Sequence, residues 1–329
     1  MFDAYRVIME DGTNLDLTGS DVFVTGGYSY IAYRTQLLTA SYPYSAGITL
    51  DNTVVTTMAT DDIGRLGWEL GQANVVDIDI KDSIINGIGG IVASAYPSGP
   101  SSGWFPDMSI TGSTLVHFEP NDEVSGSTSF YSSDTCIWTG ARDSVITGNT
   151  LVGCPAGVMF NVYYFGSIAD PGADSTLVEN NTFVDTGGLD IWFTYNGYAD
   201  DVVIRNNNFT GSVESLYGVY AQSDRSTGMI IDNNTFWSAK EAIYMRGSLD
   251  WEITDNTIHG GGDSSYAGIY ELNGYGEISG NTLIDADGGI LIDGVTTPPP
   301  QKDMRCSIGQ YSYSTFSTCS ATIVAGETL

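Results

Sequence analysis

The stretch Val178-Glu-Asn-Asn181-Thr-Phe183 decides the architecture, because close variants of it return along the chain. The strongest copies centre on Asn149, Asn181, Asn207, Asn234, Asn256 and Asn281, which lie 22 to 32 residues apart. A drifting period of this length is typical of stacked coils whose loops differ in length. The repeat therefore indicates a solenoid rather than an array of identical domains.

Weaker copies extend the repeat toward the N-terminus. Thr49-Leu-Asp-Asn52-Thr-Val54 matches directly, and Ser replaces Asn in Ile80-Lys-Asp-Ser83 and Ile110-Thr-Gly-Ser113. The predicted polar slots are Ser20, Asn52, Ser83, Ser113, Asn149, Asn181, Asn207, Asn234, Asn256 and Asn281. Nearly the whole chain then belongs to one repeat array.

Each repeat reads as about three short strands. Apolar and β-branched residues alternate before each slot, as in Asp201-Val-Val-Ile204, and a second run opened by Gly or Ala follows, as in Gly157-Val-Met-Phe160. A coil of three strands cannot bury its inward side chains alone, but stacking it on a copy pairs every strand in parallel. The sequence predicts an all-β, single-stranded parallel β-helix of about ten coils.

The polar slot has a physical meaning in such a fold. An Asn at a bend between two strands can donate its side-chain amide to the carbonyl of the Asn one coil away, and Ser performs a weaker version of this role. Such a column satisfies turn groups that would otherwise be buried without partners. We expect an internal Asn/Ser ladder along the ten slots.

From Leu17 to Asp293 these repeats resemble the right-handed parallel β-helix family, the pectate-lyase-like superfold, and most closely its generic members with an Asn-Thr-Phe or Asn-Thr-Leu turn. The resemblance implies a right-handed coil. It implies no particular activity, because the fold hosts polysaccharide lyases, glycoside hydrolases, epimerases, phage tailspikes and adhesins. Function has to be argued from individual residues.

Composition narrows the partners. With 40 acidic against 11 basic residues, the formal net charge of −29 argues against binding to nucleic acid or to anionic membranes. The dispersed acidic side chains read as a surface adapted to salt or as one that gathers divalent cations. Calcium is the cofactor that such carboxylates would hold, although the sequence identifies no ligand set for it.

Location and organisation follow from the remaining segments. No apolar stretch of membrane-spanning length occurs and no signal-peptide pattern opens the chain, so we expect a mature form or excised domain of an extracellular or cell-surface protein. Residues 1–16 are expected to form an entry strand or cap, 17–294 the β-helix, and 295–329 a Pro-rich break followed by a C-terminal cap or the start of a further domain.

Four cysteines suggest two local disulfides. Cys136 opens one strand and Cys154 precedes the equivalent strand of the next coil, while Cys306 and Cys319 bracket a Ser/Tyr-rich segment. Cys136–Cys154 and Cys306–Cys319 are the expected pairs, although four cysteines allow three connectivities. A zinc site is disfavoured, because there is no CxxC and His117 and His259 lie far apart in sequence.

An interaction face is predicted on the Gly-led strands. With the first apolar residue of each placed inward, one outward column comprises Val92, Trp138, Met159, Asp190, Tyr220, Tyr244, Tyr270 and Leu291, and the next comprises Ser94, Gly140, Asn161, Trp192, Gln222, Arg246, Leu272 and Asp293. Aromatic rings beside amides and carboxylates suit sugar rings. The alternative is that these aromatics pack beneath loops or against a neighbouring domain or subunit.

Two function classes remain. The favoured one is a noncatalytic, rigid structural or adhesive module that binds a polysaccharide or glycan on this face, at residues Trp138, Met159, Asn161, Asp190, Trp192, Tyr220, Gln222, Tyr244, Arg246 and Tyr270. The other is a polysaccharide lyase or glycoside hydrolase that uses Asp190, Arg246 and Glu214, because hydrolysis needs paired carboxylates and uronate lyases need a basic residue. No complete catalytic signature of the fold occurs in the chain.

Three triplets fit the N-x-S/T pattern of N-glycosylation and begin at Asn180, Asn208 and Asn233. They are compatible with glycosylation. The repeat phrase itself generates such triplets, so the motif alone is weak.

Overall fold

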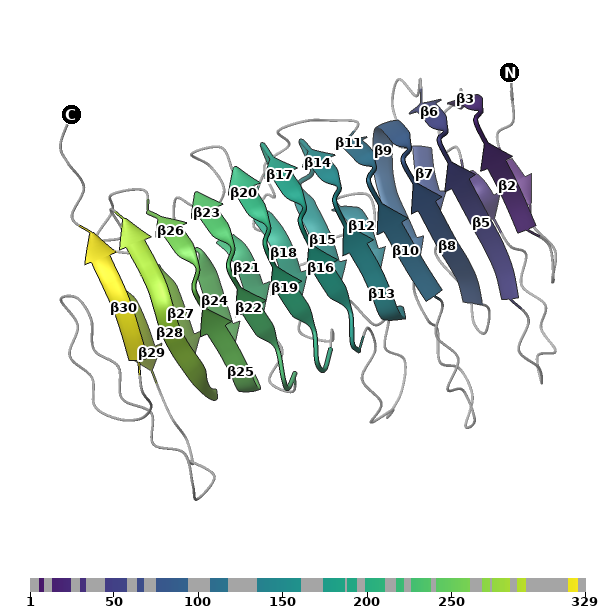
Figure 1. Cartoon of the computed structure of the whole chain (residues 1–329). Coiled ribbons are helices and arrows are strands. Elements are labelled where there is room, and N and C mark those ends of the chain that lie inside the picture. Colours follow the sequence, from purple (N-terminus) through teal and green to yellow (C-terminus); the bar gives the residue numbers. More distant parts are fainter. Residues whose placement is uncertain are drawn as a thin grey trace, which may run out of the picture.

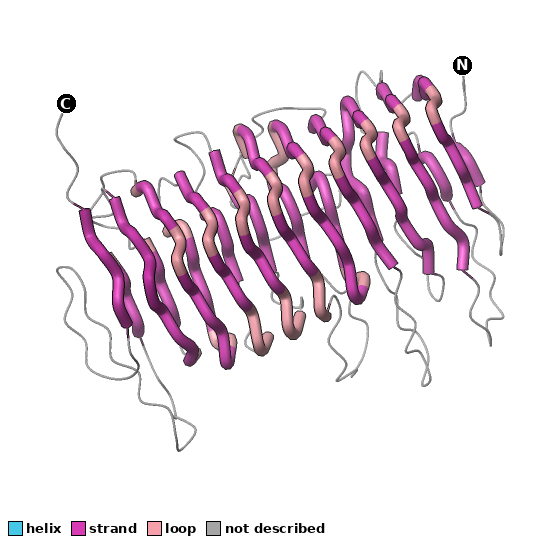
Figure 2. Tube along the Cα trace, viewed as in Figure 1, coloured by secondary structure: helices cyan, strands magenta, loops and turns pink. Residues whose placement is uncertain are grey.

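The computed structural model is an elongated rod of parallel strands that runs from the N-terminal to the C-terminal coil (Figure 1). It describes residues 6–8, 14–24, 30–33, 45–57, 64–67, 75–93, 107–117, 135–160, 174–186, 188–193, 199–210, 217–221, 226–237, 241–260, 268–272, 274–284, 289–293 and 319–324. Strands and short turns make up this part, with no helix in it (Figure 2). The chain folds as the predicted right-handed parallel β-helix.

The strands form three sheets, which we call sheets 1, 2 and 3 in the order in which each coil passes through them. Sheet 1 contains β2 (Asn14–Thr18), β5 (Ser45–Asp51), β8 (Val75–Lys81), β10 (Asp107–Thr111), β13 (Arg142–Thr147), β16 (Leu177–Glu179), β19 (Val203–Arg205), β22 (Ile230–Asp232), β25 (Leu249–Thr254) and the first half of β28 (Tyr275–Ile284).

Sheet 2 follows one tight turn later. It contains β3 (Asp21–Val24), β6 (Val54–Thr57), the first half of β9 (Ile84–Ala93), β11 (Thr114–His117), β14 (Thr150–Val152), β17 (Thr182–Val184), β20 (Asn208–Thr210), β23 (Thr235–Trp237), β26 (Thr257–His259), the second half of β28, and β30 (Cys319–Val324).

Sheet 3 closes each coil. It contains β1 (Arg6–Ile8), β4 (Tyr30–Tyr33), β7 (Gly64–Gly67), the second half of β9, β12 (Thr135–Thr139), β15 (Ala156–Phe160), β18 (Leu189–Phe193), β21 (Tyr217–Ala221), β24 (Ile243–Arg246), β27 (Ile269–Leu272) and β29 (Ile290–Asp293). All of these pairings are parallel, and each strand inside a sheet contacts its counterparts one coil before and one coil after.

Alternation of side chains along the strands builds the core. In sheet 1 the inward position is filled by Ile110, Ile146, Val178, Ile204 and Ile231 on successive coils, all fully buried. In sheet 2 the inward residues include Phe183, Phe209 and Phe236, whose rings stack with centroids 4.7 and 4.5 Å apart. A coil that cannot enclose these rings alone is covered by the next copy.

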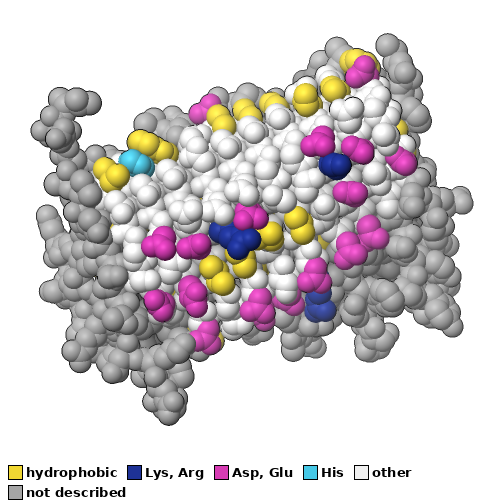
Figure 3. Space-filling view, in the orientation of Figure 1, with side chains coloured by type: hydrophobic (Ala, Val, Ile, Leu, Met, Phe, Trp, Pro, Cys, Tyr) yellow, Lys and Arg dark blue, Asp and Glu magenta, His cyan; other side chains and the backbone are white. Residues whose placement is uncertain are grey.

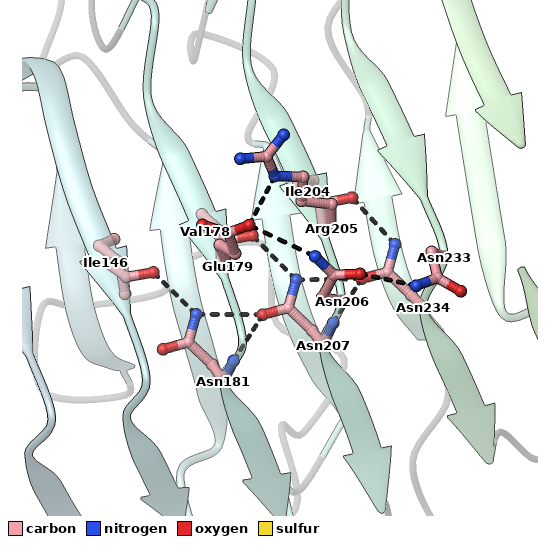
Figure 4. A network of polar contacts seen from close by, with 10 residues as sticks. All are labelled: Ile146, Val178, Glu179, Asn181, Ile204, Arg205, Asn206, Asn207, Asn233 and Asn234. Carbon is pink, nitrogen blue, oxygen red and sulfur yellow. Dashed lines mark hydrogen bonds and ion pairs between the residues drawn. The ribbon is translucent and has the colours of Figure 1, made fainter.

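The turn between sheets 1 and 2 carries the predicted ladder (Figure 4). The backbone N–H and the side-chain Nδ2 of Asn181 both donate to Oδ1 of Asn207, at 2.9 and 3.0 Å, and Nδ2 also donates to the carbonyl of Ile146 at 2.8 Å. The same pattern recurs from Asn149 to Asn256, with partners up to Asn281. The internal Asn ladder is confirmed.

The second slot differs from the prediction, because Thr53 and not Asn52 occupies it. Leu50 pairs with Ile80 and Val54 with Ile84, so Thr53 is the counterpart of Ser83. Thr53 is buried and its N–H donates to Oγ of Ser83 at 3.1 Å, whereas Asn52 is exposed. The repeat phrase assigned the slot to Asn52, because Asn is the usual slot residue, and this assignment is wrong by one residue.

Asn52 instead belongs to a second column, immediately before the slots, in which every residue has a positive φ. Its members are Gly19, Asn52, Asp82, Gly112, Gly148, Asn180, Asn206, Asn233, Asp255 and Gly280, with φ between 48° and 68°. Gly, Asn and Asp are the residues that tolerate this left-handed conformation. The bend therefore needs one residue that adopts the left-handed backbone conformation, followed by a residue whose side chain makes the hydrogen bonds of the ladder.

The ends of the chain enter the same pairing scheme. β1, within the segment expected as an entry strand, pairs with β4, and β2 pairs with β5. β30, in the segment expected beyond the Pro-rich break, pairs in parallel with β28, with Asn281 opposite Ala321. The described part of 295–329 thus adds one strand to sheet 2, and the predicted Cys306–Cys319 pair lies outside the residues whose side chains are described.

The first predicted disulfide is confirmed. Cys136 and Cys154 are joined with their Cα atoms 5.6 Å apart, and both are fully buried. The bond ties β12 to the turn that precedes β15, so it links consecutive coils. It closes a loop of 18 residues near the middle of the rod.

Candidate functional site

The outward column of sheet 3 carries most of the residues that the sequence singled out. In register from coil to coil it reads Val92, Trp138, Met159, Trp192, Tyr220, Tyr244, Tyr270 and Leu291. Parallel pairing forces these side chains into one row, because the register never slips between β12 and β29 at this position. The predicted column is therefore reproduced except at one coil.

That exception is Asp190, which does not point outward. Leu189 pairs with Ala156 and Ile191 with Val158, so Trp192 and not Asp190 lies beside Met159. Asp190 is 1% exposed, and the hydroxyl of Thr186 donates to its Oδ1. The signal that could have found this register is the ending shared by Gly157-Val-Met-Phe160 and Asp190-Ile-Trp-Phe193, which a match on the leading glycine concealed.

Small neighbours make room for the inward-facing Asp190 position. Its neighbours in register are Gly157 and, one coil later, Gly218. A Cβ built on Gly157 would lie 2.6 Å from the ring of Phe183, and one on Gly218 would lie 2.4 Å from Phe236. These two glycines allow the phenylalanine stack of sheet 2 to approach sheet 3 closely.

The outward column divides into a covered part and an open part. Trp138, Met159 and Trp192 are at most 7% exposed and form a second hydrophobic cluster outside the main core. Tyr220, Tyr244 and Tyr270 are half-buried. Burial, the alternative to an open sugar-binding platform, therefore applies to Trp138, Met159 and Trp192, and the tyrosines are the accessible segment of the column.

We call Tyr217, Tyr220, Tyr244 and Tyr270 the tyrosine cluster. The ring centroids of Tyr217 and Tyr220 are 4.5 Å apart, those of Tyr220 and Tyr244 4.8 Å, and those of Tyr244 and Tyr270 5.2 Å, the last pair edge to face. Tyr217 lies three residues before the column residue Tyr220 on β21 and was missed by the sequence reasoning. The rings share contacts across three coils, which holds their hydroxyl groups at one surface.

Charged neighbours act on the pKa of Tyr244 in opposite directions. Burial raises the pKa of Tyr244 to about 12, with further upward contributions from Tyr220, Tyr270 and Glu241 and a downward one from Arg246. Arg246 is half-buried on the same strand, two residues beyond Tyr244, and is in register with Leu272 and Asp293. Tyr244 therefore stays neutral near pH 7 and can donate as well as accept a hydrogen bond.

The residues proposed for catalysis do not converge. Asp190 faces the interior on β18, whereas Arg246 lies on β24, and β21 separates these two strands. Glu214, the suggested second carboxylate, lies outside the described residues, as do the predicted ligand-binding residues Asn161 and Gln222. Within the described part, Asp190 and Arg246 form no shared site that could act on a glycan.

A second carboxylate is buried at the other end of the cluster. Glu271 points inward from β27, is fully buried, and accepts a hydrogen bond from the N–H of Gly274 at its Oε1. Among the described residues no group of three or more His, Cys, Asp or Glu side chains could hold a metal ion. The expected calcium has no ligand set in this part of the chain.

Sheet 2 shows a feature that sequence reasoning did not find. Trp237 is 49% exposed and stacks on His259 of the next coil, with ring centroids 3.7 Å apart and planes within 2°. Because Trp237 and His259 stack along the rod axis, each ring covers one face of the other, and the ring edges point toward solvent. The pair is therefore less suited than the tilted tyrosines to receive a sugar ring.

On the face shown in Figure 3, which includes sheet 1, the charged side chains are mostly acidic, and hydrophobic side chains form small groups among them. One apolar row on sheet 1 consists of Val145, Leu177, Val203 and Ile230, which are in register on consecutive coils. The arginines beside it are already paired, Arg205 with Glu179 at 2.7 Å and Arg142 with Asp174 at 3.6 Å. The described residues contain no helix that is long and apolar enough to cross a membrane.

Comparisons with known proteins found a matching family model and similar solved structures. No curated protein matches the chain. A solved structure titled as the crystal structure of Dettilon tailspike protein is similar at 15% sequence identity and a TM-score of 0.33, and the match covers 87% of this chain and 61% of the tailspike chain. A family model described as "Periplasmic copper-binding protein (NosD)" matches residues 105–297, which is more than half of the chain. The chain therefore belongs to the NosD family.

Proposed function

We propose that this chain is a noncatalytic β-helix module of the cell envelope or extracellular space that binds neutral carbohydrate at the tyrosine cluster of sheet 3. The observation that carries the proposal is the half-buried cluster itself. Four tyrosines on three consecutive coils lie within ring contact of one another and beside Arg246. Partly open aromatic rings with hydroxyl groups offer both apolar contact and hydrogen bonds.

The chemistry of the cluster favours a neutral sugar over an acidic one. One cation and one anion accompany the rings, because Arg246 lowers the pKa of Tyr244 and Glu241 raises it. The chain as a whole carries a net charge of −29, which repels an anionic polymer at low salt. A neutral glycan avoids this repulsion while still using the tyrosine hydroxyls.

Location outside the cytoplasm has two supports. The matching family is described as periplasmic. The buried Cys136–Cys154 disulfide is the kind of bond that persists in oxidising compartments. Both fit a module that meets glycans at the cell surface or in the envelope.

The copper of the family description does not fit the described residues. His117 and His259 lie on β11 and β26, and four strands of sheet 2 separate them, so at about 4.8 Å per strand they are roughly 24 Å apart. Cys136 and Cys154 are oxidised to a disulfide. No cluster of ligands completes a site in that part, so we do not extend copper binding to it.

Binding of the purified chain to a panel of neutral and acidic polysaccharides tests the proposal, for example by affinity electrophoresis followed by calorimetry with oligosaccharides. We expect binding to a neutral member and a loss of at least tenfold in affinity for Tyr220→Ala/Tyr244→Ala. Trp237→Ala on sheet 2 is the matched control and should leave the affinity unchanged. The same assays with calcium and with a chelator test whether an ion participates.

Two results would overturn the proposal. One is that the double tyrosine variant, shown to be folded by its melting curve, binds as tightly as the parent chain. The other is release of new reducing ends or unsaturated sugars from any polysaccharide of the panel, because that outcome would identify an enzyme.

A further inference from the structure

The three sequons of the chain fall on consecutive coils in the middle of the rod. Asn180-Asn-Thr182 spans the turn between β16 and β17, Asn208-Phe-Thr210 forms β20, and Asn233-Asn-Thr235 spans the turn between β22 and β23. All three therefore lie at the bend between sheets 1 and 2 or on the first strand after it. The repeat explains why such triplets occur, but it does not decide which amides can react.

The structure separates the first residue of each triplet from the ladder. Asn180, Asn208 and Asn233 are exposed, whereas the ladder residues Asn181 and Asn234 are at most 1% exposed. Asn180 and Asn233 occupy the left-handed column, with φ of 56° and 50°. This conformation carries their side chains to the outside of the bend.

Hydrogen bonding reinforces the separation. Nδ2 of Asn181 donates to the carbonyl of Ile146 and to Oδ1 of Asn207, so both of its N–H bonds are used inside the rod. Nδ2 of Asn233 donates to Oδ1 of Asn206 at 2.7 Å. An amide nitrogen has two N–H bonds, so this contact leaves the second for substitution.

We propose that Asn180, Asn208 and Asn233 are acceptors for N-linked glycans. The donor is a lipid-linked oligosaccharide phosphate or pyrophosphate, used by an oligosaccharyltransferase of the source cell. Nδ2 forms a bond to the sugar C1 as the bond from C1 to the phosphate oxygen breaks, and the lipid phosphate leaves with that electron pair. The amide loses one proton to solvent, and no oxidation state changes.

The third residue of each sequon is partly exposed, and the hydroxyl of Thr210 donates a hydrogen bond to the carbonyl of Phe183 at 2.8 Å. Thr182, Thr210 and Thr235 are half-buried outward residues at the start or end of strands of sheet 2. A glycan at these positions would extend from the bend between sheets 1 and 2, because the acceptor side chains point away from the core. The tyrosine cluster of sheet 3 would remain uncovered by it.

The chain contains its own matched control. Asn206 occupies the same left-handed column between Asn180 and Asn233, with φ of 58° and an exposed side chain (Figure 4). Its triplet Asn206-Asn-Asn208 lacks a hydroxyl residue at the third position. Asn206 thus shares exposure and backbone geometry with Asn180 and Asn233 but lacks the sequon, and its Nδ2 donates to Oε1 of Glu179 at 3.3 Å.

The test is peptide mapping of the protein purified from its source cells. Enzymatic release of glycans in heavy-oxygen water, followed by mass spectrometry, converts each occupied Asn to a labelled Asp. We expect label at Asn180, Asn208 and Asn233 and none at Asn206. The proposal is overturned if the peptides that contain the three acceptors are recovered whole and unlabelled, without attached sugar.

Substitutions of Thr182 in the same cells test whether glycosylation of Asn180 requires the sequon or only an exposed side chain. Thr182→Ala should abolish occupancy at Asn180 and leave the other two sites occupied, whereas Thr182→Ser should retain it. Occupancy at Asn180 that persists in Thr182→Ala would contradict the proposed transfer. Because Thr182 is an outward residue, neither change disturbs the core.

Discussion

The two halves of the internal ladder form the same bend with different side chains, hydroxyls from Thr53 to Ser113 and amides from Asn149 to Asn281. From Asn181 to Asn281 each amide oxygen accepts two hydrogen bonds from the preceding coil, and each Nδ2 from Asn149 to Asn256 reaches both neighbouring coils. At Ser83 and Ser113 the hydroxyl instead accepts one backbone N–H from the preceding coil, as that of Ser113 does from Ser83 at 3.0 Å. Its own proton goes to a nearby carbonyl, that of Thr111 at 2.9 Å.

The difference shows what an amide adds to a turn. In the Ser/Thr half the described side chains join coils only through the backbone, whereas in the Asn half they are also bonded directly to each other. The number of groups that lose a partner on substitution is therefore larger in the Asn half. Stability should respond accordingly.

The largest effect is expected for Asn207→Leu. The N–H of Asn181, the carbonyl of Val178 and Oδ1 of Asn234 each lose a partner in the buried interior. Since each unsatisfied buried group costs about 1–3 kcal/mol, the free energy of unfolding should fall by roughly 3 kcal/mol. Chemical denaturation measures it. An unchanged midpoint would mean that the ladder is not a source of stability.

A smaller loss is expected for Ser113→Ala. The N–H of Ser83 loses its acceptor, and the expected cost is about 1 kcal/mol. The converse change, Ser113→Asn, would place an amide beside Asn149 and extend the Asn half by one coil. If Ser113→Ala proves as costly as Asn207→Leu in the same denaturation assay, the contrast between the two halves is wrong.

Gly148→Ala tests the other residue of the bend. Gly148 has a φ of 68°, and a Cβ there would meet nothing closer than 3.7 Å, so the expected cost of about 1 kcal/mol is conformational rather than steric. Gly148→Asn should cost less, because Asn already occupies this column at Asn180, Asn206 and Asn233. Thermal unfolding of the two variants ranks them, and equal melting temperatures would contradict the conformational argument.

The smallest effect concerns pH in the Ser/Thr half. Burial raises the pKa of Asp77, a hydrogen bond from the N–H of Asp107 lowers it, and the carboxylate of Asp107 raises it. Because the folded chain then holds this proton more tightly than the unfolded chain, the ionised group lowers stability above its folded pKa, and this loss is relieved as the pH falls through that pKa.

Asp77→Asn should therefore stabilise the rod slightly at pH 7, and its advantage over the parent chain should disappear in acid. Unfolding curves recorded at several pH values measure this difference. Asp79→Asn, at an exposed position on the same strand, controls for the loss of one negative charge from an acidic surface. A pH-independent advantage would argue against the pKa shift.

Much of the fold could be predicted from sequence because each coil repeats the same local rules. In every coil the inward residue, the residue with positive φ and the ladder residue follow one another in the same sequence order. This order predicts the slots from Ser83 onward and the parallel pairing, and the coil assignment of Cys136 and Cys154 predicts their disulfide. Asn52 was misplaced because two adjacent positions accept the same residue type for different reasons, one for backbone conformation and the other for hydrogen bonding.

The candidate site was less predictable. Register on sheet 3 depends on which residue pairs with which across a variable loop, so Asp190 and Trp192 exchanged roles when the leading glycines were aligned. Burial of Trp138 and Met159 depends on what covers the sheet and not on the strand itself. Tyr217 joins the cluster through Tyr220 on its own strand and Tyr244 one coil later, and it does so from outside the alternation that defined the predicted column.

The ladder also gives the interior of the rod a net dipole along its long axis. Each Oδ1 from Asn181 to Asn281 accepts from the coil before it, so the side-chain carbonyls all turn toward the N-terminal end and their dipoles add instead of cancelling. Hydrogen bonds in such a chain polarise one another. The series stops at Asn281, whose Nδ2 turns back to the carbonyls of Ile253 and Ser279. The rod therefore has two unlike ends, and a coil in the middle is strengthened by neighbours that it does not touch.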